Sequence, residues 1–122
     1  MELSLNKKEV ACLLLHMTAM RKNIKNVLKS NYGKKEGKEH LNCYDEVKEI
    51  LKGDFELFDE EDYESNISVG LDSKQLNMLS SFVCIYKDKL KAFLEEAKAA
   101  DEKENKEQLD LLIQVKGKIE NV

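Results

Sequence analysis

The stretch LNKKEVACLLLHMTAMRKNIKNVLK, residues 5–29, decides the fold class. Its apolar residues recur at intervals of three and four, the spacing that gives an α-helix one apolar face. Further small and apolar residues widen this face, which predicts a central and mostly buried helix over residues 7–30. The residues that form the apolar face are Val10, Leu13, Leu14, Met17, Met20, Ile24, Val27 and Leu28.

A specific start signal precedes this helix and occurs again later in the chain. Asn6 and Glu9 have the spacing of a capping box, in which each side chain accepts a hydrogen bond from the other residue's backbone amide. Asp72 and Gln75 have the same spacing at the start of LDSKQLNMLSSFVCIYKDKLKAFLE, residues 71–95, which predicts a second long helix over residues 73–99. Both starts also have the spacing of a hydrophobic staple (Leu5 with Val10, Leu71 with Leu76).

The two long stretches align with each other at a constant offset of 66 residues. Leu5 matches Leu71 and Leu13 matches Leu79, and polar positions such as Asn6 and Asp72 correspond. This agreement suggests an internal duplication. The alternative is that any two amphipathic helices that begin with capping boxes would align as well.

Two shorter helical patterns follow, over residues 43–52 and 103–120. A charged segment with two glycines, residues 31–40, is typical of a flexible loop. We therefore predict an all-α fold, a compact bundle of four helices arranged as two helical hairpins. The single domain, residues 1–122, would comprise a first hairpin (6–53), an acidic and partly ordered connector (54–70) and a second hairpin (71–122). Residues 3–5 and 67–69 could alternatively be two short strands that pair.

Composition limits the class of protein. The 122 residues include no proline and three cysteines, and the longest apolar run is far shorter than a membrane span. No signal peptide is recognisable, so we expect a cytoplasmic protein with reduced thiols. The Lys/Glu/Asn-rich composition is typical of AT-rich bacteria and their phages. The wide apolar faces leave homodimerisation open.

Charge is distributed unevenly along the chain. The net charge of −4 comprises +5 over residues 1–40, −8 over residues 41–64 and −1 over the remainder. The acidic run is the predicted partner-binding surface, and a basic set at the end of the first helix is a secondary surface. The acidic residues are Asp54, Glu56, Asp59, Glu60, Glu61, Asp62 and Glu64, and the basic residues are Arg21, Lys22, Lys25 and Lys29.

No motif for catalysis or cofactor binding is present, and we predict neither an enzyme nor a cofactor. One weak alternative is a zinc site, because a Cys–His pair four residues apart and a His–Cys pair three residues apart could supply four ligands. The four residues are Cys12, His16, His40 and Cys43.

The leading hypothesis for function is a non-enzymatic protein-interaction module of a bacterial or phage cytosolic system. The main alternative is an acidic inhibitor that mimics nucleic acid and blocks a nucleic-acid-binding protein, such as a phage-encoded defence antagonist. A small zinc-binding helical protein is the second alternative. The acidic composition argues against direct binding of nucleic acid.

Overall fold

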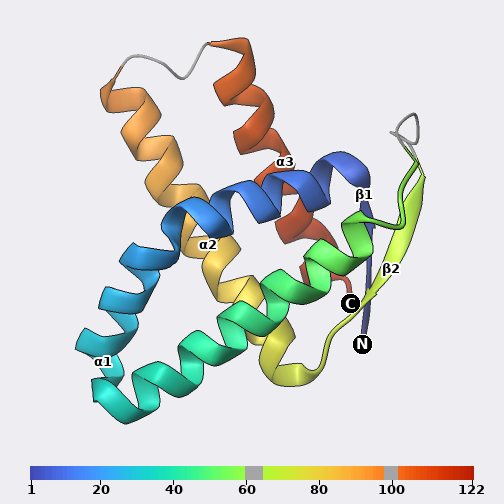
Figure 1. Cartoon of the computed structure of the whole chain (residues 1–122). Coiled ribbons are helices and arrows are strands. Elements are labelled where there is room, and N and C mark those ends of the chain that lie inside the picture. Colours follow the sequence, from blue (N-terminus) through green and yellow to red (C-terminus); the bar gives the residue numbers. More distant parts are fainter. Residues whose placement is uncertain (60–64, 98–101) are drawn as a thin grey trace.

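A computed structural model describes residues 1–59, 65–97 and 102–122, which form three helices and a two-stranded sheet (Figure 1). The prediction of a four-helix bundle made of two hairpins is therefore wrong. In chain order the elements are β1 (Glu2–Asn6), α1 (Lys7–Phe55), β2 (Asn66–Gly70), α2 (Ser73–Glu96) and α3 (Lys103–Glu120).

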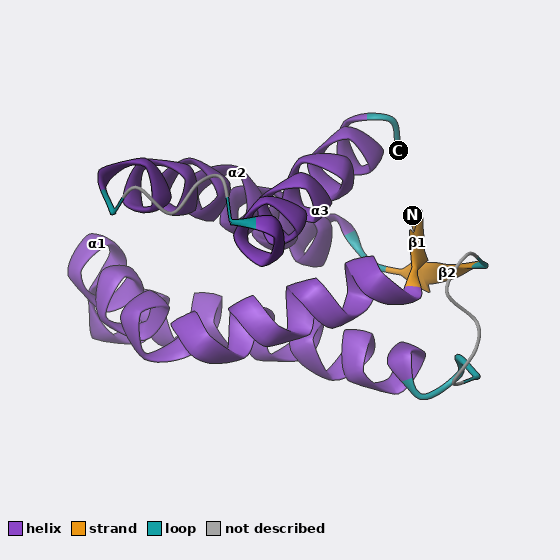
Figure 2. Cartoon of the chain, turned by 90° about the horizontal axis from the view of Figure 1, so that it is seen from above, coloured by secondary structure: helices purple, strands orange, loops and turns teal. Residues whose placement is uncertain are grey.

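The helix count differs because α1 continues through the predicted loop. Within α1 only Gly33 has non-helical backbone angles, φ 81° and ψ 177°, a combination that favours glycine. The helix bends back there, so that its two arms lie side by side (Figures 1 and 2). Gly37, the second glycine of the predicted loop, is helical and buried, and a Cβ atom there would lie 2.9 Å from the carbonyl oxygen of Leu28. We call residues 29–38 the elbow of α1.

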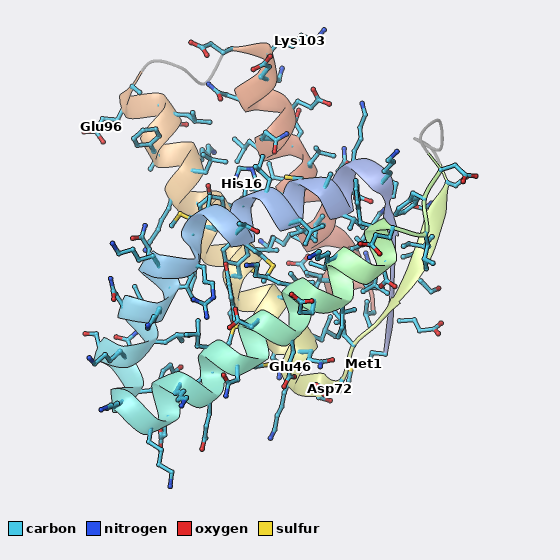
Figure 3. The ribbon with its side chains drawn as sticks, viewed as in Figure 1. Met1, His16, Glu46, Asp72, Glu96 and Lys103 are labelled. Atoms are coloured by element: carbon cyan, nitrogen blue, oxygen red, sulfur yellow. The ribbon has the colours of Figure 1, made fainter. Side chains whose placement is uncertain are left out.

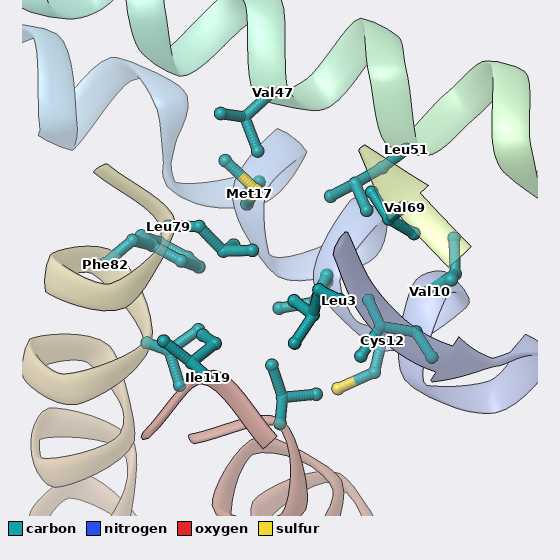
Figure 4. Close-up of a cluster of buried hydrophobic side chains, with 14 of the residues drawn as sticks. Leu3, Val10, Cys12, Met17, Val47, Leu51, Val69, Leu79, Phe82 and Ile119 are labelled. Atoms are coloured by element: carbon teal, nitrogen blue, oxygen red, sulfur yellow. The ribbon is translucent and has the colours of Figure 1, made fainter. Parts of the chain in front are cut away.

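The helices form two layers. Figure 2 shows the arms of α1 in one layer and α2 with α3 in the other, with the sheet at the end away from the elbow. Apolar side chains from both layers and from the sheet fill the space between them, and Figure 4 shows Leu3 of β1 within this core. No helix in the described ranges is long and apolar enough to cross a membrane.

Both capping boxes are confirmed. The side chain of Asn6 accepts from the amide of Glu9, and Glu9 Oε1 accepts from the amide of Asn6 at 2.9 Å. Asp72 and Gln75 make the equivalent pair of bonds at the start of α2. The predicted bounds of α3 are also confirmed, whereas α2 ends at Glu96 and the predicted residues 98–99 lie outside the described ranges.

The two short strands pair in antiparallel register, which was the alternative interpretation of residues 3–5 and 67–69. Leu3 lies opposite Val69 and Leu5 opposite Ile67, and the apolar side chains of the pair face the core. The connector predicted over residues 54–70 is thus partly regular structure, since α1 extends to Phe55 and β2 begins at Asn66. Strand pairing joins segments 60 or more residues apart in the sequence. Because the strands are antiparallel, α1 and α2 start at opposite ends of the strand pair (Figure 1).

Candidate functional site

The acidic residues that the structure describes lie where the second arm of α1 ends. The side chains of Glu56 and Asp59 are exposed. Asp54 is half-buried, and this burial raises the pKa of its carboxyl group. The backbone carbonyl of Asp59 accepts a hydrogen bond of 2.9 Å from Lys7 Nζ, which joins this segment to the start of α1. We call Asp54, Glu56 and Asp59 the acidic end; Glu60, Glu61, Asp62 and Glu64 of the predicted surface lie outside the described residues.

The basic residues of the predicted secondary surface have two different environments. Lys22, Lys25 and Lys29 are exposed, and none forms an ion pair with a described residue. Arg21 instead makes a bidentate contact with Asp45, through Nε to Oδ1 at 2.8 Å and Nη2 to Oδ2 at 2.7 Å. The guanidinium group holds the pKa of the Asp45 carboxyl below its usual value. Arg21 therefore connects the two arms of α1 across the layer.

The acidic end and the elbow lie far apart. Lys35 and Glu56 are 21 positions apart along one helical arm, which at about 1.5 Å per residue separates them by ~32 Å. The exposed lysines at positions 29, 34, 35 and 38 gather around the elbow. The described acidic residues do not fold back onto this basic cluster, so their charge stays available at the opposite end of the molecule.

The four residues of the zinc alternative are not brought together. Both ring nitrogens of His16 are occupied by other side chains, and His40 packs on Tyr32 with ring centroids 4.2 Å apart. Cys12 is buried, and burial raises the pKa of its thiol to about 12. Among the residues that the structure describes, no group of three His, Cys, Asp or Glu side chains could hold a metal ion.

His16 joins all three helices. It lies on the first arm of α1 (Figure 3), where Nε2 is 2.9 Å from Gln108 Oε1 of α3 and Nδ1 is 2.9 Å from the hydroxyl of Tyr86 of α2. An amide oxygen only accepts, so Nε2 carries the proton and Nδ1 accepts from the tyrosine. Desolvation lowers the pKa of His16, which favours this neutral form. The arrangement positions helices and leaves neither nitrogen available for proton transfer.

A buried carboxylate lies at the start of α1. Glu9 is fully buried; its Oε1, besides capping the helix, accepts from Lys118 Nζ of α3 at 2.5 Å. Glu9 Oε2 has no hydrogen-bond partner among the described atoms. Sequence reasoning found the capping role of Glu9 but missed Lys118, as it missed Tyr86 and Gln108, because no local pattern indicates contacts across 70 to 109 residues.

Comparison with known proteins gives no relative: no family model, no curated protein and no solved structure matches this chain. The physical properties of its own residues therefore carry the functional argument.

Proposed function

We propose that this chain is a non-enzymatic protein-interaction module of a bacterial or phage cytosol, and that its acidic end contacts a basic surface on a partner protein. The observation that carries the proposal is the placement of Glu56 and Asp59. Both are exposed, neither forms an ion pair with a described residue, and both are far from the elbow lysines.

Electrostatics explain why such an arrangement suits binding. Carboxylates that lack partners within their own molecule attract lysine and arginine side chains of another protein, which accelerates association and selects the partner by its charge. Because the second arm of α1 is helical throughout and Arg21 joins it to the first arm, the acidic end and the basic elbow stay separated. A partner therefore meets exposed carboxylates at this end, next to Lys7, which donates to the Asp59 carbonyl.

The environments of Cys12 and His16 support a binding role over catalysis at these two residues. A catalytic cysteine needs a thiolate, and the Cys12 thiol, with a pKa of about 12, stays protonated at neutral pH. His16 has both nitrogens bonded to neighbouring helices. Neither residue has the accessible and activated state that nucleophilic catalysis requires.

A pair of variants with equal charge changes tests the proposal. Glu56→Gln with Asp59→Asn removes two charges from the acidic end, whereas Glu95→Gln with Glu96→Gln removes two exposed charges from the end of α2. Wild type and both variants are used as bait in the native host, and captured proteins are quantified by mass spectrometry. We expect a partner that wild type and the α2 variant capture equally and that the acidic-end variant loses.

The same capture experiment separates the two functional hypotheses. If the partner binds nucleic acid and DNA or RNA competes with this chain for it, the acidic inhibitor is the better description. If nucleic acid does not compete, the module binds another kind of basic surface. Equal capture by all three proteins contradicts a role for the acidic end.

A further inference from the structure

Strand β2 has one edge that pairs with β1 and one that does not. Met1 and Leu71 exchange two backbone hydrogen bonds, of 3.1 and 2.9 Å, just beyond the ends of the strands. Bonded and non-bonded pairs alternate along an antiparallel ladder, so Val69 and Ile67 bond to β1. The N–H and C=O groups of Ser68 therefore point to the opposite edge. The same alternation turns the backbone groups of Asn66 and Gly70 to that edge.

This outer edge is accessible. Asn66, Ser68 and Gly70 are all exposed, and within the described ranges no hydrogen bond reaches their outward backbone groups. Figure 1 shows β2 at the outer margin of the molecule. Helix α1 contacts both strands, and α3 contacts β1. A depression of about 540 Å³ lies between β1 and the end of α3, and Lys118 of α3 reaches the side chain of Asn66 but not its outward backbone groups.

The outer edge also lacks three of the features that usually prevent strand pairing. The sequence NISVG contains no charged residue and no proline, and its register with β1 is continuous, without a bulge. The face that β2 turns to the core is incompletely covered. Leu5 is fully buried, whereas Ile67 directly opposite is only half-buried. A further strand beside β2 would cover the exposed part of Ile67.

The sequence of β2 indicates which strand would pair with its outer edge. In the existing pair, the Leu-Ser-Leu sequence of β1 lies opposite the Ile-Ser-Val sequence of β2, with Ser4 opposite Ser68. A second β2 has the same apolar–serine–apolar pattern that β2 already pairs with. Two chains of net charge −4 repel each other overall, and β2 adds no charged side chain to this repulsion.

We infer that the outer edge of β2 pairs with the same edge of a second copy of this chain. The two Ser68 residues lie opposite each other on a two-fold axis, and Asn66 of each copy lies opposite Gly70 of the other. The result is a closed dimer with one four-stranded antiparallel sheet, in which β1 strands form the outer edges. This interface uses none of the residues of the acidic end, so either inference can fail without the other.

Proline substitution tests the interface directly. Ser68→Pro removes the outward N–H group but no bond to β1, and Ser68→Ala keeps that N–H group. Ser4→Pro makes the matched change on the edge of β1 that faces away from β2. Sedimentation equilibrium should show wild type and Ser68→Ala in monomer–dimer equilibrium. The dimer of Ser68→Pro should be weaker by about tenfold or more, because two symmetric hydrogen bonds are lost. Ser4→Pro should dimerise like wild type.

Cysteine cross-linking gives a second readout that does not depend on proline being tolerated. In a background of Cys43→Ser and Cys84→Ser, Ser68→Cys should form a covalent dimer on mild oxidation, since Cα atoms of a bonded pair lie about 5.5 Å apart. Ser4→Cys should not. A wild type that stays monomeric up to about 1 mM, a folded Ser68→Pro that dimerises as wild type does, or equal cross-linking of the two cysteine variants would overturn the inference.

Discussion

Replacing Gly37 by alanine should destabilise the protein, although alanine is the better helix former. The new Cβ atom would lie 2.9 Å from the Leu28 carbonyl oxygen and 3.0 Å from Lys29 Cα, both backbone atoms of the opposite arm. Backbone cannot move aside as a side chain can, so the overpacking cost falls toward the upper end of about 1–3 kcal/mol. The higher helix propensity of alanine offsets roughly 1 kcal/mol of this cost. We expect a net loss of about 2 kcal/mol.

Gly117 of α3 provides the matched control. It is also a glycine within a helix, but a Cβ atom there would meet no atom within 4 Å. Gly117→Ala should therefore stabilise the protein by about 1 kcal/mol. Urea unfolding followed by far-UV circular dichroism measures both variants against wild type. If Gly37→Ala is as stable as Gly117→Ala, the two arms of α1 do not approach each other at the elbow.

Three further predictions concern buried polar groups. Tyr44→Phe removes the buried hydrogen bond from the tyrosine hydroxyl to the Met17 carbonyl and should cost about 1 kcal/mol in urea unfolding, whereas an unchanged stability would argue against that contact. The pKa of His16 in the folded protein is below 6.5, so the unfolded chain binds more protons and the free energy of unfolding should decrease as pH falls through 6.5. The variant His16→Asn should lose this pH dependence. An equal dependence on pH in both proteins would contradict the prediction. The Cys12 thiol should resist Ellman's reagent at pH 8 until the protein unfolds, because its pKa is about 12, and rapid labelling of Cys12 in the folded state would show that it is accessible.

Local signals explain what could be predicted from the sequence. The capping boxes at Asn6 and Asp72 are encoded within four residues each, and both helix starts follow from them. The apolar spacing of residues 103–120 is likewise local and predicts α3 correctly. These features depend only on contacts between neighbours in the chain.

The predictions that failed depend on tertiary structure. Two glycines and several charges suggest a loop over residues 31–40, but only Gly33 leaves the helix, and Gly37 is needed because the arms approach closely there. The strands are too short for alternation alone to identify, and their pairing spans 60 or more residues.

The candidate site shows the same division. The exposure of Glu56 and Asp59 agrees with a solvated acidic segment, which the sequence indicates. The ion pair of Arg21 with Asp45 could not be predicted, because it forms only when the bend at Gly33 brings the two arms together. The free edge of β2 likewise becomes visible only once the register with β1 is known. Sequence patterns therefore identified the charged residues but not which of them are engaged within the fold.

The separation of acidic end and elbow can be measured directly by electron–electron double resonance between spin labels at positions 35 and 56, both of which are exposed. An unbroken helical arm predicts a backbone separation of about 32 Å, to which the labels add their own length. Adding Asp59→Asn to the labelled protein should leave the distance unchanged, because no attraction to the elbow holds the acidic end in place. A distance below roughly 20 Å, too short for 21 residues of helix, would mean that the acidic end folds onto the elbow lysines and is not available to a partner.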